Sequence, residues 1–153
     1  VWRISEEAVT RGLRAAVWPA RMELVRRNPD MILDGGHNPQ CMGALRRALE
    51  ELYPNRKILF MTGVLSDKDY PSMLGELLPL SKGFVTITPD SDRALSAGEL
   101  AQYLRQAGAE AQPCGSVSEG IRTVLDLAQP DDVVCVCGSL YMIGEARHAL
   151  GLC

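Results

Sequence analysis

The sequence predicts an α/β fold in which a mostly parallel sheet carries helices on both faces. Short apolar runs alternate along the chain with stretches whose apolar residues recur at helical spacing. The runs are rich in β-branched or aromatic residues and are followed by Gly, Asp or Pro, as in strands buried on both faces. With 153 residues, 46% hydrophobic and 23% charged, the chain suits one ordinary domain that buries its own core.

The first thirty residues lie outside this alternation. Residues 6–16 carry a helical pattern and follow Ser5, a good N-cap, so we expect a short helix there. A strand is expected over residues 21–27, before the repeating units begin. Residues 1–4 contain neither Met nor a capping residue, and we expect this chain to be cut from a longer one.

Strands and helices then alternate along the rest of the chain. Each strand-to-helix step favours a right-handed crossover, and therefore a parallel sheet covered on both faces. A weaker run at residues 109–113 is expected to be an edge strand because it ends in Pro113. The stronger strands are expected at residues 31–33, 58–61, 84–87 and 133–137, and the helices around apolar stripes that begin at Met42, Met73, Leu100, Ile121 and Met142.

Composition and cysteine usage exclude several classes of protein. No apolar run approaches the ~20 residues of a membrane helix, and no signal peptide is recognisable. The net charge of −3 gives no broad basic field, so nucleic acid is not expected as a partner. Five cysteines without paired spacing indicate reduced thiols and a cytoplasmic protein. Cys135 and Cys137 alternate along a buried strand and are interpreted as core residues, not as metal ligands.

The segment Asp34-Gly35-Gly36-His37-Asn38-Pro39 is the strongest candidate site. It follows the strand at 31–33, and ligands bind beyond the C-terminal ends of parallel strands. Asn38 can cap the next helix with Pro39 in its first position, so free N–H groups and a partial positive charge lie beside His37. A well-capped turn explains part of this pattern, but an acid and a histidine together at a strand tip favour function. Asp34 is placed to accept hydrogen bonds from hydroxyl groups or to balance a cation.

Two further strand ends carry polar residues. Ser139, in Gly138-Ser139-Leu140-Tyr141, is placed to cap the last helix, and capping and ligand binding explain it equally well. Asp67-Lys68-Asp69 follows the strand at 58–61, and such triplets are most often solvated charge runs. The sequence has no Gly-x-x-x-x-Gly-Lys-Ser/Thr loop, so a triphosphate site would have to be supplied elsewhere.

Several motifs resemble the C-terminal domain of folylpolyglutamate synthases and dihydrofolate synthases, within the Mur ligase superfamily. Trp18-Pro19-Ala20-Arg21, followed by Met22-Glu23, is similar to the family pattern Trp-Pro-Gly-Arg, and residues 34–39 are similar to Asp-Gly-Ala-His-Asn-Pro. Asp67-Lys68-Asp69, Arg93-Ala94-Leu95 and Gly138–Tyr141 match in order, so the resemblance covers essentially the whole chain. Two residues depart from it: Ala20 replaces a glycine, which bears on the backbone angle before Arg21, and Gly36 replaces an alanine.

The resemblance implies a domain organisation and a reaction. Residues 1–153 would form a glutamate-ligase domain with a Rossmann-like three-layer sandwich, and an N-terminal ATPase domain, absent from this chain, would be its partner. That domain would make most of the contacts to ATP and Mg²⁺. The family reaction joins L-glutamate to dihydropteroate or to a folate: ATP phosphorylates the acceptor carboxylate, and the glutamate amine attacks the acyl phosphate.

The resemblance also implies roles for individual residues. Arg21 would be catalytic and would bind the nucleotide phosphates, and Asp34 would contact the nucleotide from the same side. His37 would be catalytic and would bind the incoming glutamate together with Ser139, with Arg93 as a further ligand for its carboxylates. No metal ligand is expected in this chain, and the isolated domain is expected to be inactive.

Other functions remain open at the level of the sequence. A cell-wall Mur ligase would share the architecture, although those ligases resemble a Lys- or Thr-bearing variant of the loop at residues 34–39. A free-standing nucleotide- or amino-acid-binding module, or a purely structural domain, would lack the ATPase partner. The choice between dihydrofolate and polyglutamate synthesis would depend on a pterin pocket outside this chain.

Overall fold

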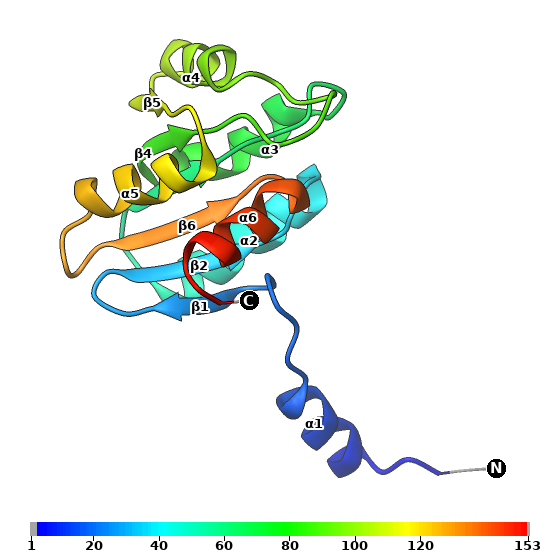
Figure 1. Cartoon of the computed structure of the whole chain (residues 1–153). Helices are drawn as coiled ribbons and strands as arrows, with labels where there is room; N and C mark the ends of the chain where they lie inside the picture. The colour runs from blue at the N-terminus through cyan, green and yellow to red at the C-terminus, as the bar shows by residue number, and fades with distance from the viewer. Residues whose placement is uncertain (1–2, 153) are drawn as a thin grey trace.

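A six-stranded sheet forms the centre of the protein in the computed structural model, which describes residues 3–152 (Figure 1). The strand order is β1-β2-β6-β3-β4-β5, with β1 antiparallel to β2 and all other pairs parallel. This arrangement confirms the predicted α/β class with a mostly parallel sheet. The strands are β1 (Glu23–Arg26), β2 (Asp30–Asp34), β3 (Ile58–Thr62), β4 (Ser81–Thr86), β5 (Ala111–Pro113) and β6 (Val133–Cys137).

Helices cover both faces of this sheet and complete three layers. One face packs against α5 and α6 through a core that includes Ile121, Val124 and Ile143, and the other against α2, α3 and α4 through a core that includes Leu49, Met73 and Leu100. The helices are α2 (Pro39–Leu52), α3 (Tyr70–Leu77), α4 (Ala97–Gln106), α5 (Val117–Leu127) and α6 (Leu140–Ala149), and a 3₁₀ turn, Leu78–Leu80, follows α3.

The central strands end level with one another, and this positions the candidate site. Cys137 of β6 pairs with Asp34 of β2 on one side and with Thr62 of β3 on the other. The loops that follow these strands therefore emerge side by side at one edge of the sheet, which is the edge that binds ligands in open parallel sheets. Cys135 and Cys137 are fully buried, as predicted, and the thiols of Cys41, Cys114, Cys135 and Cys137 are free.

Three strands, β1, β4 and β5, begin two or three residues away from the predicted position, whereas the ends of β2 and β3 differ by one residue. β1 begins at Glu23 and not at residue 21, because Ala20 and Met22 adopt positive φ angles of 58° and 45°. β4 begins three residues earlier than predicted, since Ser81 and Gly83 pair with β3. β5 covers only residues 111–113, at the edge of the sheet as expected.

The first helix, α1 (Glu6–Ala15), stands away from the rest of the domain (Figure 1). Ser5 caps it as predicted, by accepting a hydrogen bond from Ala8 N at 3.2 Å. None of its residues is buried. Over residues 3–152, no helix is long and apolar enough to cross a membrane.

Candidate active site

The loop between β2 and α2 has the predicted cap. Asn38 Oδ1 accepts a hydrogen bond from Cys41 N at 2.9 Å, and Pro39 occupies the first turn of α2. His37, which is half-buried, donates from Nδ1 to Gly35 O at 3.0 Å. Because a carbonyl oxygen can only accept, this bond places a proton on Nδ1 and leaves Nε2 as the acceptor of the neutral imidazole.

Asp34 lies beneath this loop and is 8% exposed. Its Oδ1 accepts from Gly36 N at 2.8 Å, and its Oδ2 accepts from Met22 N at 3.0 Å. The carboxylate therefore joins the His37 loop to the segment that carries Arg21. Buried carboxylate oxygens need such donors, and backbone N–H groups provide them here.

Arg21 lies in a tight turn between Ala20 and Met22. Ala20 keeps a left-handed conformation, with φ of 58°, which is the region that favours the glycine of the family pattern. Its carbonyl oxygen accepts from Gly35 N at 2.9 Å and from Arg21 Nη1 at 3.0 Å. The exposed Arg21 is thus tied to the loop after β2.

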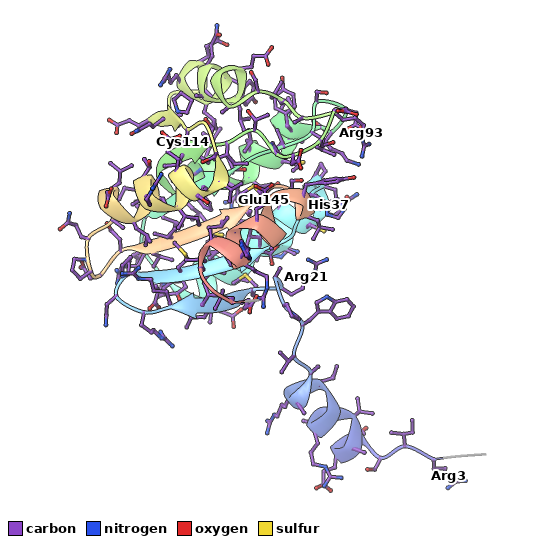
Figure 2. All side chains as sticks on the ribbon, viewed as in Figure 1. Arg3, Arg21, His37, Arg93, Cys114 and Glu145 are labelled. Carbon is purple, nitrogen blue, oxygen red and sulfur yellow. The ribbon has the colours of Figure 1, made fainter. Side chains whose placement is uncertain are left out.

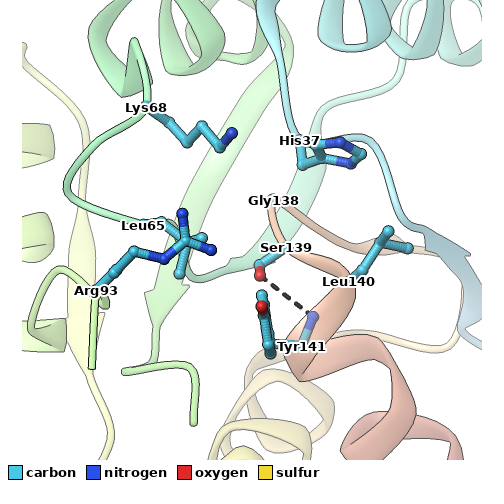
Figure 3. A pocket seen from close by; sticks show the side chains of 8 residues that line it. All are labelled: His37, Leu65, Lys68, Arg93, Gly138, Ser139, Leu140 and Tyr141. Carbon is cyan, nitrogen blue, oxygen red and sulfur yellow. Dashed lines mark hydrogen bonds between the residues drawn. The ribbon is translucent and has the colours of Figure 1, made fainter. Parts of the chain in front are cut away.

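A cavity of about 170 Å³ opens where the loops after β2, β3, β4 and β6 meet (Figure 3). Ser139 lies at its floor, 2% exposed, and accepts a hydrogen bond from Tyr141 N at 3.3 Å as the N-cap of α6. The structure brings together three of the predicted residues here, His37, Arg93 and Ser139. The lining residues are His37, Leu65, Lys68, Arg93, Gly138, Ser139, Leu140 and Tyr141.

Arg93 is held in place by the loop after β3. Its Nη1 donates to Asp67 Oδ2 at 2.7 Å, and its carbonyl oxygen accepts from Ser66 N and Ser66 Oγ at 2.7 and 3.0 Å. Interaction with the Tyr141 side chain, followed by attraction to Asp67, raises the pKa of Arg93 above its ordinary value. The guanidinium therefore brings a permanent positive charge to the cavity rim.

The triplet at residues 67–69 is more than a solvated charge run. Asp67 pairs with Arg93, Asp69 Oδ1 accepts from Ser72 N at 3.2 Å as the cap of α3, and Lys68 lines the cavity. Sequence reasoning did not include Lys68 or Tyr141 among the site residues. Both follow the C-terminal ends of central strands, and this position is the signal that could have identified them.

Arg21 and Asp34 line a second hollow of about 310 Å³ beside the first. The five predicted residues are therefore divided, three in the cavity and two in this neighbouring hollow, with the loop at residues 34–37 contributing to both. Figure 2 shows Arg21, His37 and Arg93 following one another along the same edge of the domain. Gly138 N also donates to Gly36 O at 3.2 Å, which joins the loop after β6 to the loop after β2.

The cavity suits a small anion. Lys68 and Arg93 bring positive charge, Ser139 brings a hydroxyl group, and the N-terminus of α6 adds a partial positive charge. Within residues 3–152, no cluster of three or more His, Cys, Asp or Glu side chains is arranged to hold a metal ion.

Comparison with protein families gives a match over most of the chain. The family described as "Mur ligase, glutamate ligase domain" matches residues 20–140. The chain belongs to this family. The match runs from Ala20 to Leu140, and so includes the Arg21 turn and every residue that lines the cavity except Tyr141.

Individual relatives agree with this Mur ligase assignment. A probable bifunctional folylpolyglutamate synthase/dihydropteroate synthase from Halobacterium salinarum is 35% identical over 94% of this chain and 18% of its own length. The dihydrofolate synthase/folylpolyglutamate synthase of Bacillus subtilis is 30% identical over 96% of this chain and 34% of its own. This chain therefore spans about a third or less of these two relatives.

Solved structures of folate ligases share the fold. The bifunctional folylpolyglutamate synthase/dihydrofolate synthase of Yersinia pestis, in complex with AMPPNP and Mn, superimposes with a TM-score of 0.88 at 32% identity, over 99% of this chain and 36% of that one. Another structure of such a bifunctional enzyme, with Mn, AMPPNP and L-glutamate bound, gives the same TM-score, identity and coverage. The predicted family is thus confirmed.

Proposed function

We propose that this chain is the glutamate-binding part of an ATP-dependent folate ligase of the cytoplasm. The acceptor would be dihydropteroate, a folate, or both. The observation that carries the proposal is the cavity in which His37, Arg93 and Ser139 meet Lys68 at the N-terminus of α6, within a chain of the glutamate ligase family. The folate ligase structure that contains L-glutamate supports the choice of this amino acid.

The charges of the cavity suggest how glutamate would be held. Lys68 and Arg93 would each face a carboxylate, and Ser139 with the first N–H groups of α6 would donate further hydrogen bonds. His37 Nε2, left as an acceptor by the Nδ1–Gly35 bond, would take a proton from the ammonium group so that the amine can attack. The product would be an amide, with ADP and phosphate released.

Arg21 would act on the nucleotide side of the reaction. Its guanidinium is exposed beside the second hollow, and a guanidinium at the phosphates stabilises the charge of phosphoryl transfer. Both carboxylate oxygens of Asp34 accept hydrogen bonds from backbone N–H groups. Its contribution to nucleotide binding would therefore be to hold the Arg21 turn against the loop after β2. In this proposal, ATP and Mg²⁺ are bound mainly by an N-terminal ATPase domain, which would close over the cavity.

Glutamate binding tests the proposal directly. Lys68→Met removes one charged donor from the cavity, and a hydrogen bond to a charged group contributes about 1.5–3 kcal/mol, so L-glutamate should bind roughly tenfold or more weakly. Calorimetry or NMR titration of the chain measures this. Lys57→Met, which removes an exposed lysine that bonds to Pro79 O, is the matched control and should leave binding unchanged. Equal effects of the two substitutions would contradict the assignment of the cavity.

The isolated chain should not hydrolyse ATP. Its sequence lacks the phosphate-binding loop that the reaction requires, so addition of L-glutamate and a folate should release no phosphate above the blank. A phosphate-release assay on the purified 153 residues measures this. Glutamate-dependent hydrolysis by the chain alone would show that the proposed division of labour between two domains is wrong.

A further inference from the structure

The turn around Arg21 has a conformation that its own residues do not favour. Ala20 and Met22, on either side of Arg21, both have φ in the left-handed region, where residues with a Cβ are strained. Such strain persists only where the surroundings over-determine it. The contacts that hold this turn therefore decide where Arg21 lies.

Two carboxylates hold the turn from opposite sides. Glu23 Oε2 accepts from Ala20 N at 2.7 Å, and Asp34 Oδ2 accepts from Met22 N at 3.0 Å. Glu23 lies on β1 and Asp34 on the neighbouring β2. The amides on both sides of Arg21 are thus fixed by side chains at one end of the sheet.

Glu23 is in turn held by α6. Arg147 Nη1 contacts both carboxylate oxygens of Glu23, and Arg147 Nη2 donates to Leu152 O at 3.0 Å. The two side chains are only 19% and 27% exposed, so the pair is shielded from solvent more than a surface ion pair. The hydrogen bond from Arg147 is the largest cause that keeps the pKa of Glu23 below its ordinary value.

We infer that Glu23 and Arg147 are positioning residues for Arg21, which fix its turn in the left-handed conformation without touching the ligand. The inference rests on the proposed role of Arg21 at the nucleotide phosphates. Helix α6 then supports both parts of the site. Ser139 caps the first turn of α6 at the cavity, and Arg147 in the last turn of α6 holds the Arg21 turn through Glu23.

The order of the turn can be measured on the chain itself, without ligand. In Arg147→Met, amide hydrogen exchange at Ala20 and Met22 should accelerate about tenfold or more, as expected for the loss of a hydrogen bond between charged groups, and the Arg21 side-chain NMR signal should shift. Exchange at Phe60 in β3 should not change. Lys82→Met, which breaks the Lys82–Asp132 pair, is the matched control and should leave the turn unaffected.

Conservative variants separate positioning from general stability. Glu23→Gln retains an oxygen that can accept from Ala20 N, so its turn should exchange more slowly than that of Glu23→Ala, and Arg147→Lys should partly restore the wild-type Arg21 signal. The inference is overturned if Arg147→Met leaves the turn unchanged, or if exchange accelerates equally at Phe60. If Glu23→Ala does not fold, Arg147→Met still decides the matter because both carboxylates remain.

Nucleotide binding distinguishes this inference from the proposed function. ADP titrated into the wild-type chain should shift the Arg21 signal, and Arg147→Met should weaken that response while Lys82→Met does not. If ADP binds the wild-type chain, as shifts of other signals would show, and leaves the Arg21 signal unchanged, the proposed role of Arg21 fails, and the effect of Arg147→Met on the order of the turn is still measured. If ADP binds equally well to Arg147→Met, the positioning role fails and the role of Arg21 stands.

Discussion

Gly35 connects the Arg21 turn to His37, because its N–H donates to Ala20 O at 2.9 Å and its carbonyl oxygen accepts from His37 Nδ1 at 3.0 Å. A Cβ atom at this position would overlap Leu140 Cδ2 and would come within 2.5 Å of Arg21 Nη1. The lack of a side chain, and not a special backbone angle, is therefore what the site requires here. Leu140 begins α6 beside Ser139, so an added methyl group would displace residues of both parts of the site at once.

Gly35→Ala should alter the site at a small cost in stability. Overpacking in a rigid core costs about 1–3 kcal/mol, but here the two atoms in the way lie at the ends of flexible, exposed side chains that can move aside, so we expect the free energy of unfolding to fall by about 1 kcal/mol or less, together with NMR shifts at Arg21 and Leu140. Chemical denaturation supplies the free energy. Gly144→Ala, in α6 with open space around it, is the control and should raise stability by about 0.5–1 kcal/mol. Unchanged NMR signals of Arg21 and Leu140 in Gly35→Ala would contradict this prediction, because they would show that the added methyl group moves neither side chain.

Tyr53, at the end of α2, should lose its hydroxyl proton at a higher pH than an ordinary tyrosine. Burial, followed by the hydrogen bond from its hydroxyl group to Asp30 Oδ2 at 2.9 Å, raises its pKa from 10.0 to about 12. The folded state thus holds this proton more tightly than the unfolded state. The resulting contribution to stability is fully present below pH 10 and is lost as pH rises through about 12. Phenolate absorbance should show one late step that Tyr53→Phe removes; an unchanged curve in that variant would contradict the assignment.

At the scale of elements, α1 is not part of either hydrophobic core. None of its residues is buried. Leu13 within the helix is 73% exposed, and Ile4 and Val17 on either side of it are 75% and 91% exposed. An isolated helix of ten residues is marginal in water, so α1 should exchange its amides quickly in this chain.

Removal of residues 1–17 should therefore leave the domain nearly as stable as before. Substitutions and deletions that touch no buried group change stability by about 0.5 kcal/mol or less, and we expect a difference of that size in the free energy of unfolding. Denaturation of the two forms, followed by far-ultraviolet circular dichroism, makes the comparison. A loss well above 1 kcal/mol would mean that α1 packs on the domain in solution.

The sequence predicted elements best where local pattern determines them. Buried strands such as β3 and β6 are apolar runs of β-branched and aromatic residues, and caps such as Asn38 act within one helical turn, so both were predicted correctly. The start of β1 was not predicted correctly, because the turn before it is hydrogen-bonded to Asp34 and, through Glu23, to Arg147, and both residues are distant in sequence. The extension of β4 to Ser81 likewise depends on pairing with β3.

The same distinction applies to the site. The rule that ligands bind at strand ends, together with the family motifs, was enough to single out His37, Arg93 and Ser139, which the structure brings into one cavity. Lys68 and Tyr141 satisfy the same rule and could have been included, but the sequence does not show how the loops after β3 and β6 fold against each other and so bring them into one cavity. The functional roles of all these residues stay predictions until the binding experiments are done.

At the scale of the whole molecule, one sheet separates two cores. Met31 on β2 belongs to the core beneath α5 and α6, and Met73 on α3 to the core on the opposite face; both are fully buried. Because neighbouring residues of each central strand point into opposite cores, neither core can form without the sheet that supports the other. Helices α2 and α6, which begin at the candidate site, are therefore expected to be lost together.

Met31→Ala and Met73→Ala should each lower the stability of the same single unfolding transition. Truncation of a buried methionine costs about 2–5 kcal/mol, and the two variants should shift one cooperative curve by amounts in that range. Leu52→Ala, at a leucine that is 61% exposed, is the control and should change little. Far-ultraviolet circular dichroism follows the helices of both faces, and NMR signals of methyl groups follow each core separately. If the two cores unfolded at different denaturant concentrations in either variant, the two faces of the sheet would be independent of each other. Some of the loops that line the cavity would then lose their supporting helices before the rest of the domain unfolds.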